Sequence, residues 1–245
     1  MNLPKMNLHS HSRYSDGAGK IKHIVKRSVK IGLKYLAITD HLTDSWKAGI
    51  MPTLDSKQKI DRYLNEISRC RRELDRKKSS LKIYKGVEID IGSSEKHILN
   101  LVDPRKFDII LWEYLETPES IGFVRKIIYR WTRSFKEKGN SPIFGLAHFN
   151  PSYFLHSGME LLIRFLKEFN IYFEFNTRYS DCFSTKNETF FGKLREEKIP
   201  VGVGSDTHNL GGLDRLKDPL SMVSYYNLEE NYGLLISILN NNYNG

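Results

Sequence analysis

The sequence has very little cysteine and no long apolar run. With only Cys70 and Cys182, the chain cannot build a disulfide-rich scaffold or a cysteine-rich zinc module. No stretch approaches the roughly 18 consecutive apolar residues that a membrane-spanning helix needs. The amino-terminal residues also lack the pattern of a signal peptide. These absences predict a soluble, cytoplasmic protein with no membrane partner.

The chain also lacks internal repeats and a Pro/Gly/Ser-rich linker, so we predict one domain over residues 1–245, a length typical of an α/β barrel. Only the Asn-rich end at 240–244 approaches low complexity, and it is expected to fray. Hydrophobic residues at 40% and charged residues at 27% are typical of a folded protein. Acidic residues are in deficit, with 29 Asp and Glu against 38 Lys and Arg, a net charge of +9. That balance favours an anionic ligand such as a phosphate ester or a nucleic acid.

Short apolar runs alternate with amphipathic stretches along the chain. The runs are predicted to be strands buried on both faces, at residues 6–8, 35–39, 83–89, 108–112, 143–147, 171–175 and 201–204. Apolar residues repeat at helical spacing around residues 21–29, 60–74, 123–135, 161–169, 190–194 and 228–239. This alternation predicts a seven-stranded parallel α/β barrel, TIM-like, with helices outside.

Side chains of the metal-ligating type follow the predicted strands. They are His9, His11 and Asp16 after the first strand, His41 after the second, Glu88 at the end of the third, His148 after the fifth, and Asp206 and His208 after the seventh. Five of the eight histidines therefore lie just beyond strand ends. Because the carboxyl ends of parallel strands converge on one mouth of a barrel, we expect these side chains to share a cleft.

Imidazole and carboxylate groups together suit Zn, Mn or Fe. In His9-x-His11 both rings point to one side, since side chains of an extended segment alternate with a period of two. Alone, Asp40-His41 could form a turn and Glu88 an ion pair, but their joint placement favours metal binding. The candidates exceed what one ion can take, so two or three divalent ions are predicted, and Glu88 could bridge a pair. Paired ions suit phosphate-ester displacement because they stabilise both the attacking and the leaving oxygen.

The motifs resemble those of the PHP (polymerase and histidinol phosphatase) family and come in that family's order. They are Leu8-His9-Ser10-His11-Ser12 with Ser15-Asp16-Gly17, Ile38-Thr39-Asp40-His41, Gly86-Val87-Glu88, Ala147-His148 and Gly204-Ser205-Asp206-Thr207-His208. The resemblance implies a distorted seven-stranded α/β barrel and a metal-dependent phosphoesterase with up to three ions. It implies a first ion on His9, His11, Glu88 and Asp206, a second on Glu88 and His148, and a third on Asp16, His41 and His208. It also implies attack on phosphorus by a metal-bound water, with no protein nucleophile.

One departure concerns the second ion, because the family's further histidine after the fourth strand is missing here. Glu113 or Glu116 could replace it, since a carboxylate binds the same metals. Otherwise the second site is weak or empty. His97 is the nearest spare histidine.

For substrate binding, Arg178 lies just past the sixth strand, and its guanidinium can hold phosphate through two hydrogen bonds. Weaker candidates are Asn176, Lys186 and Asn209. The long loop at 43–55, which contains Trp46 and Met51, could form a wall of the mouth.

The sequence thus predicts a metal-dependent enzyme that hydrolyses a small phosphomonoester or a nucleotide. Two alternatives stay open. A nuclease or oligonucleotide phosphodiesterase is compatible with the basic charge, although no nucleic-acid-binding module is recognisable. A degenerate metal-binding protein that acts as an interaction module has the missing histidine as its only support. The sequence gives no indication of the oligomeric state.

Overall fold

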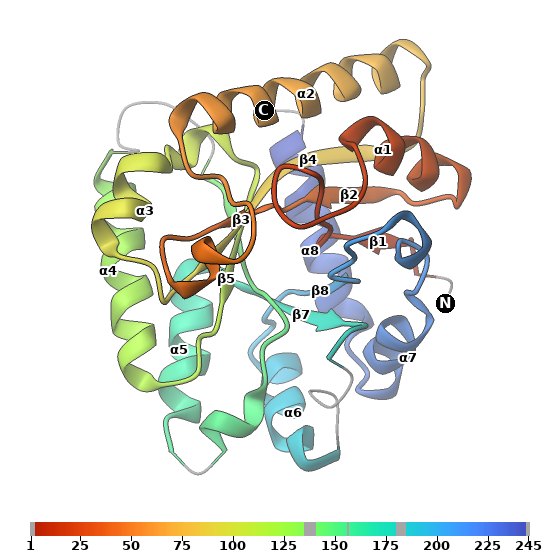
Figure 1. The fold of residues 1–245 in the computed structure, drawn as a ribbon. Helices are drawn as coiled ribbons and strands as arrows, with labels where there is room; N and C mark the ends of the chain where they lie inside the picture. Colours follow the sequence, from red (N-terminus) through yellow and green to blue (C-terminus); the bar gives the residue numbers. More distant parts are fainter. Residues whose placement is uncertain (1–2, 135–140, 156, 180–184, 244–245) are drawn as a thin grey trace.

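Parallel strands form a nearly closed barrel with helices around it (Figure 1). The computed structural model describes residues 3–134, 141–155, 157–179 and 185–243. The strands are β1 (Met6–Asn7), β2 (Tyr35–Ile38), β3 (His41–Leu42), β4 (Lys82–Asp90), β5 (Ile109–Glu113), β6 (Ile143–Leu146), β7 (Tyr172–Asn176) and β8 (Val201–Gly204). Their order around the barrel is β1-β2-β4-β5-β6-β7-β8, with β3 beside β4. The predicted seven-stranded α/β barrel is confirmed.

The additional short strand β3 follows β2 in the chain and pairs with the same neighbouring strand, β4. Tyr35 of β2 pairs with Lys82 of β4, and His41 of β3 pairs with Glu88 in the same register. The strand was predicted to end at residue 39, with His41 just beyond it. Pairing with β4 instead holds the backbone of His41 directly beside Glu88.

The barrel closes between its first and last strands. The backbone N–H of Leu8 donates to the carbonyl of Val203 over 2.9 Å, and Ser10 forms an isolated parallel bridge with Thr207. This closure brings the segment after β1 next to the segment after β8. Two stretches that lie about as far apart in the sequence as the chain allows thus become neighbours at one end of the barrel.

Helices surround the barrel on its outside (Figure 1). They are α1 (Ile21–Lys30), α2 (Lys57–Arg76), α3 (Glu95–Leu101), α4 (Pro118–Ser134), α5 (Met159–Phe169), α6 (Glu188–Glu196) and α7 (Lys217–Tyr225). The sequence analysis missed α7, whose first turn contains Pro219 and whose apolar stripe is short. Proline is tolerated at this place because the first helical N–H groups have no partner within the helix.

The last helix, α8 (Glu229–Tyr243), covers the amino-terminal end of the barrel. The hydroxyl of Tyr84 in β4 donates to the carbonyl of Leu239, and the hydroxyl of Tyr232 donates to the carbonyl of Pro4. Asn240 accepts hydrogen bonds from Tyr35 and from Lys82. The expectation that the Asn-rich end frays is therefore wrong as far as Tyr243, because Asn240 is tied to two strands.

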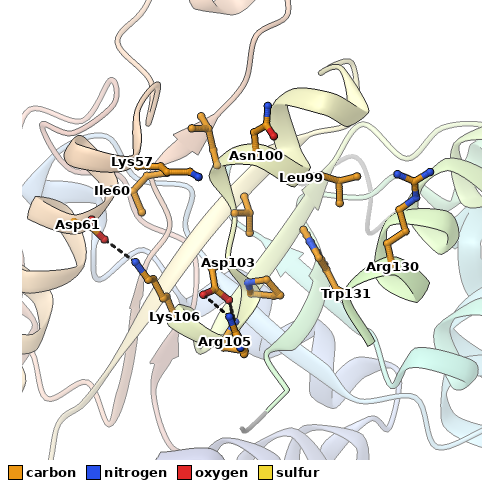
Figure 2. A pocket seen from close by; sticks show the side chains of 13 residues that line it. Lys57, Ile60, Asp61, Leu99, Asn100, Asp103, Arg105, Lys106, Arg130 and Trp131 are labelled. Carbon is orange, nitrogen blue, oxygen red and sulfur yellow. Dashed lines mark hydrogen bonds and ion pairs between the residues drawn. The ribbon is translucent and has the colours of Figure 1, made fainter. Parts of the chain in front are cut away.

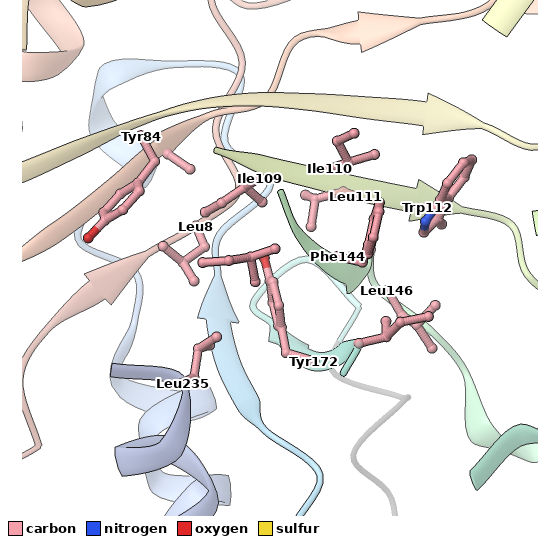
Figure 3. Close-up of a cluster of buried hydrophobic side chains, with 14 of the residues drawn as sticks. Leu8, Tyr84, Ile109, Ile110, Leu111, Trp112, Phe144, Leu146, Tyr172 and Leu235 are labelled. Atoms are coloured by element: carbon pink, nitrogen blue, oxygen red, sulfur yellow. The ribbon is translucent and has the colours of Figure 1, made fainter. Parts of the chain in front are cut away.

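Large apolar side chains fill the barrel interior (Figure 3). Leu8, which follows β1, Ile109 and Leu111 of β5, and Tyr172 of β7 are fully buried there. Gly145 of β6 leaves room for this packing, because a Cβ atom at that position would lie 2.5 Å from the ring of Tyr172. Among the described residues, no helix combines the length and apolar character needed to span a membrane.

Candidate metal centre

All eight residues that the sequence singled out as metal ligands lie together at the carboxyl ends of the strands. Glu88 belongs to β4 and His41 begins β3, while the others stand in the segments that follow β1, β6 and β8. Most of these side chains are buried, and Asp16 and His208 are partly exposed at the rim. The residues come from five separate parts of the chain, and the barrel geometry gathers them in one place.

Glu88 is the centre of the cluster. Its Oε1 lies 3.2 Å from Nε2 of His9 and 3.3 Å from Nε2 of His148. Its Oε2 lies 2.9 Å from Nδ1 of His41 and 3.5 Å from Nε2 of His11. One fully buried carboxylate thus faces four imidazole rings, which suits a group that bridges two cations.

A second carboxylate, Asp16, faces the outer histidines. Its Oδ2 lies 2.9 Å from Nε2 of His208 and 3.7 Å from Nε2 of His41, and its Oδ1 lies 3.6 Å from Nδ1 of His11. Asp206 approaches Nε2 of His11 to 3.0 Å. Potential ligand atoms lie within 4.8 Å of one another in three overlapping groups: His11, Asp16, His41 and His208; His9, His11 and Asp206; His41, Glu88 and Glu113.

The structure places Glu113, and not Glu116, beside this cluster. Glu113 ends β5, is buried, and has its Oε1 3.4 Å from Nε2 of His148. Its two oxygens also accept hydrogen bonds of 2.7 Å from Nζ of Lys47. Glu116 is exposed on the wall of an adjacent pocket. His97 belongs to α3, and its Nδ1 lies 4.0 Å from Oδ2 of Asp44. It does not take the place of the missing histidine.

Strained backbone is concentrated at this mouth. Among the described residues, seven other than glycine have a positive φ. Four of them, at 78, 170, 198 and 227, lie one or two residues past the carboxyl ends of helices, where this conformation is common. The other three are Tyr114 (φ 66°), His148 (φ 32°) and Asp206 (φ 45°), each at the end of a different strand. Such conformations persist only where the surroundings enforce them, and they occur often at functional sites.

Glu174 of β7 is a residue of the site that the sequence analysis missed. Its oxygens lie 3.0 and 3.1 Å from Nδ1 of His9, and it also accepts hydrogen bonds from the backbone N–H of His148 and from the side chain of Asn176. A carboxylate accepts only, so Nδ1 of His9 must carry a proton and Nε2 presents its lone pair to the cluster. Gly204 of β8 makes room for this contact, because a Cβ atom there would overlap the Glu174 carboxylate. The sequence signal that could have indicated Glu174 is a charged residue within an otherwise largely apolar predicted strand.

We expect Glu174→Gln to weaken metal binding or activity by roughly 10–100-fold, the usual effect of removing a partner that orients a metal-binding histidine. The amide retains the shape of the side chain but cannot accept through both of its terminal atoms. Metal titration of the purified variant checks this, with the exposed Glu116→Gln as the matched control. Equal affinities in the two variants would contradict the role of Glu174.

The loop that carries Asp16 is held by another buried carboxylate, Asp40. It accepts hydrogen bonds of 2.6–2.9 Å from the backbone and side chain of both Ser12 and Ser15. The loop folds back so tightly that a Cβ atom on Gly17 would overlap the backbone of His11. Asp40 therefore positions the cluster without being part of it.

The carboxylates of the cluster attract positive charge strongly. Burial lowers the pKa of His41, but Glu88, Glu113 and Asp16 outweigh it and raise the pKa to about 9. Burial acts in the same direction on His148, where Glu113 and Glu88 raise the pKa to about 10. Burial would raise the pKa of Asp206, but the adjacent histidines hold it well below its usual range. Protons and metal ions compete for such a site.

Metal affinity is therefore expected to increase with pH. At pH 7.5 the metal-free chain holds His41 and His148 protonated, and metal binding requires neutral imidazole, so protons must leave. The gain in affinity should continue until the pH passes about 9 to 10. Calorimetric titration with Mn²⁺ in two buffers of different ionisation enthalpy measures the proton release directly. Binding with no proton release at pH 7.5 would refute this expectation.

The buried donor set fits divalent cations. The atoms His11 Nδ1, His41 Nδ1, Glu88 Oε1 and Glu88 Oε2 are buried without a hydrogen-bond partner within the part of the chain that the structure describes. In addition, Nε2 of His9 faces Nε2 of His11 at 3.0 Å. Buried polar atoms are normally satisfied, and nitrogen and oxygen atoms that converge in this way suit a bound cation, for which metal ions compete with the protons on the histidines.

The residues proposed for substrate binding take different positions. Arg178 lies at the mouth, half exposed, with Nη1 3.3 Å from Oδ2 of Asp206. Asn176 is buried and bound to Glu174 and to the backbone N–H of Arg178, so it positions its neighbours. Asn209 accepts from the backbone of residues 211 and 212 and caps a short turn. Lys186 is exposed, and no contact with the cluster is found in the described ranges.

A further hollow of about 440 Å³ lies between α2, α4 and the segment 99–106, on the outer ring (Figure 2). Two ion pairs lie in its wall, Asp61 with Lys106 and Asp103 with Arg105. Its lining includes no residue of the cluster. This hollow therefore has no part in the candidate metal centre at the mouth of the barrel.

A parallel α/β barrel thus gathers histidines and carboxylates at its strand ends in groups that could hold metal ions. A family model, the PHP domain, matches residues 7–146. The chain belongs to the PHP domain family, as its motifs predicted.

Known proteins agree with this assignment. Over 87 residues, 36% of the chain, it is 33% identical to the DNA polymerase/3'-5' exonuclease PolX of Bacillus subtilis, and the match spans 14% of that protein. Its fold is similar to that of histidinol phosphate phosphatase from Lactococcus lactis, solved with zinc, L-histidinol and phosphate, with a TM-score of 0.57, 17% identity, and 92% and 94% of the two chains covered. It is also similar to structures described as metal-dependent tyrosine phosphatases from Bacillus subtilis and Streptococcus pneumoniae, with a TM-score of 0.59, 16% identity, and 97% and 95% covered.

Proposed function

We propose that this chain hydrolyses small phosphate monoesters, nucleotides included, with the help of divalent metal ions held at the barrel mouth. The observation that carries this proposal is the buried His and carboxylate cluster with unpartnered atoms facing its interior. Membership of the PHP domain family supports phosphoester hydrolysis as the reaction.

In this proposal His9, His11 and Asp206 hold one ion together with Glu88. Asp16, His41 and His208 hold another. His148 lies beside Glu88 at the remaining position, where Glu113 stands in place of the missing histidine and is paired with Lys47. Bound ions of this kind supply an activated water and neutralise charge that develops on the phosphoryl oxygens.

The chain's own residues orient the reacting groups. Glu174 fixes the ring of His9, and the backbone carbonyl of Asp206 accepts from Nδ1 of His208 over 3.0 Å, so Nε2 of both rings points inward. Arg178 brings a guanidinium to the edge of the cluster, where it can hold a phosphate through two hydrogen bonds. In this proposal a phosphoryl group binds between the Arg178 guanidinium and the metal ligands.

A pocket next to the cluster favours a small substrate. It has a volume of about 280 Å³ and is lined by His148 and Arg178 together with Tyr114, Tyr153 and Tyr179. The ring of Tyr179 lies 4.3 Å from the ring of His148. Pockets for small organic ligands are typically about 300–1,000 Å³, so this one suits a compact group with an aromatic or apolar face.

A nuclease is the second candidate, favoured by a basic groove beside the Asp16 loop. The groove has a volume of about 570 Å³, and six of its lining residues are Lys or Arg: Arg13, Lys20, Lys22, Lys59, Arg62 and Arg69. Such a groove could follow a phosphodiester backbone. The similarity to PolX over 87 residues agrees with this candidate.

One comparison tests both. Protein purified without a histidine tag is analysed for metals by elemental mass spectrometry, and then assayed for phosphate release from a panel of monoesters and for shortening of a labelled single strand. Phosphate release that Asp206→Ala abolishes supports the monoesterase. Strand shortening that falls steeply with salt supports the nuclease. A chain that takes up neither Mn²⁺ nor Zn²⁺ overturns hydrolysis and leaves the interaction module.

A further inference from the structure

Lys47 is an unusual neighbour for a metal centre. It stands in the short helix η1 (Trp46–Gly49) of the 43–55 loop, and only 7% of its surface is exposed. Its ammonium donates to both oxygens of Glu113 over 2.7 Å and lies 4.2 Å from the centre of the Tyr114 ring. Lysine is rarely buried unless its charge is paired, so this contact is a built feature of the site.

The loop that delivers Lys47 is firmly anchored. Asp90, at the end of β4, accepts hydrogen bonds from the hydroxyls of Thr43 and Ser45. The hydroxyl of Ser45 in turn accepts from the backbone N–H of Lys47. The two carboxylate oxygens of Asp44 accept from the backbone and the hydroxyl of Ser94. The backbone of Lys47 is therefore fixed by the loop, and its ammonium is held at a defined place beside Glu113.

Glu113 has the surroundings of a metal ligand. Its Oε1 lies 3.4 Å from Nε2 of His148, whose same nitrogen lies 3.3 Å from Glu88. Its Oε2 lies 3.8 Å from Nδ1 of His41. Glu88, Glu113 and His148 together offer two carboxylates and an imidazole, a set that suits Zn or Mn. Yet both oxygens of Glu113 already face the ammonium.

We propose that the Lys47 ammonium serves as the permanent cation of the position between Glu88, Glu113 and His148, and that it keeps a metal ion from binding there. The proposal rests on the proposed function, because it assumes that the rest of the cluster holds metal. A divalent ion bound to Glu113 would stand next to a buried ammonium with little water between them, and the two positive charges would repel strongly. The native chain then binds one ion fewer than its carboxylates and histidines could hold.

The metal content of four variants tests this proposal. Lys47→Met removes the charge at nearly constant length, and Lys47→Arg retains it. Glu113→Gln removes the carboxylate, and the double variant removes both. Each protein is stripped, reloaded with Mn²⁺, dialysed, and analysed by elemental mass spectrometry beside the native chain.

We expect Lys47→Met to gain about one equivalent of Mn²⁺ over the native chain, since both oxygens of Glu113 are then free to face a metal ion. Lys47→Arg, Glu113→Gln and the double variant are expected to match the native metal content. The dependence on Glu113 distinguishes a new ion at this position from adventitious binding elsewhere.

Two results would overturn the proposal. One is a folded Lys47→Met variant with the native metal content, and the other is loss of an ion in Glu113→Gln, which would show that Glu113 binds metal despite Lys47. If Lys47→Met does not fold, Glu113→Gln still decides. A native chain that loads metal while Lys47→Met gains none defeats this inference alone, whereas a native chain that loads no metal defeats the proposed function as well.

Discussion

Replacing Glu88 by Gln is expected to lower kcat/KM by roughly 10²–10³-fold or more, the range seen when one preorganised electrostatic group is removed from a site. The metal content should fall in parallel. Glu88 is fully buried and faces His9, His11, His41 and His148, so its charge acts on the ion that it shares with His9, His11 and Asp206 and on the rings next to it. The amide keeps the volume of the side chain but brings two N–H donors toward nitrogen lone pairs. Steady-state phosphate release and elemental mass spectrometry together check the expectation.

The control for this variant is Glu197→Gln, which removes a carboxylate from an exposed ion pair with Lys167. Exposed pairs contribute little to stability, and this one lies outside the cluster. It should retain native metal content and activity. If Glu88→Gln behaved like this control, the central role of Glu88 would be refuted. Equal melting temperatures of the two variants would exclude unfolding as the cause of any loss.

Tyr172→Ala is expected to destabilise the fold by roughly 3–5 kcal/mol, as for other large aromatic side chains removed from a core. Tyr172 is fully buried among residues from several strands inside the barrel (Figure 3). Its ring packs against Gly145, where a Cβ atom would leave no room for it. The cavity left behind can close only by moving strands, because the barrel is held by backbone hydrogen bonds. The melting temperature should fall by roughly 6–20 °C for a chain of this size, measured by circular dichroism.

Tyr172→Phe is the matched variant, and it separates ring packing from the hydroxyl. Among the described residues the Tyr172 hydroxyl is buried without a hydrogen-bond partner. Removing an unsatisfied polar group is close to neutral or stabilising. We therefore expect Tyr172→Phe to melt at or above the native temperature. A loss comparable to that of Tyr172→Ala would mean that the hydroxyl is satisfied in solution and contributes to the core.

The fold could be predicted because its strands carry their own signal. Strands buried on both faces, such as β5 and β7, are apolar runs of limited length, and amphipathic helices stand between them. The elements that were missed lack such a signal. Helix α7 begins with a proline in its first turn, and β3 is two residues long and becomes a strand only by pairing with β4. Asn240 was expected to fray because it belongs to the Asn-rich end, and no local signal indicated its hydrogen bonds to Tyr35 and Lys82.

The candidate ligands could be predicted for a related reason. His9, His41, Glu88, His148 and Asp206 each follow or end a strand, and parallel strands bring their carboxyl ends together. For these residues, being next to the end of a strand was therefore enough to predict where they lie in the folded chain. The choice between Glu113 and Glu116 needed the structure, because only side-chain direction at the end of β5 separates a buried carboxylate from an exposed one.

The sequence by itself determined the barrel, the family motifs and the ligand types, because these depend on local periodicity and on residues fixed to strand ends. Only the tertiary structure decided which side chains support the cluster. Glu174 reaches His9 across the barrel, and Lys47 reaches Glu113 from a loop with no periodic pattern. Asn176 and Asn209 proved to be engaged in structural hydrogen bonds. Contacts of this kind arise from packing between segments far apart in the chain, and no local rule of sequence encodes them.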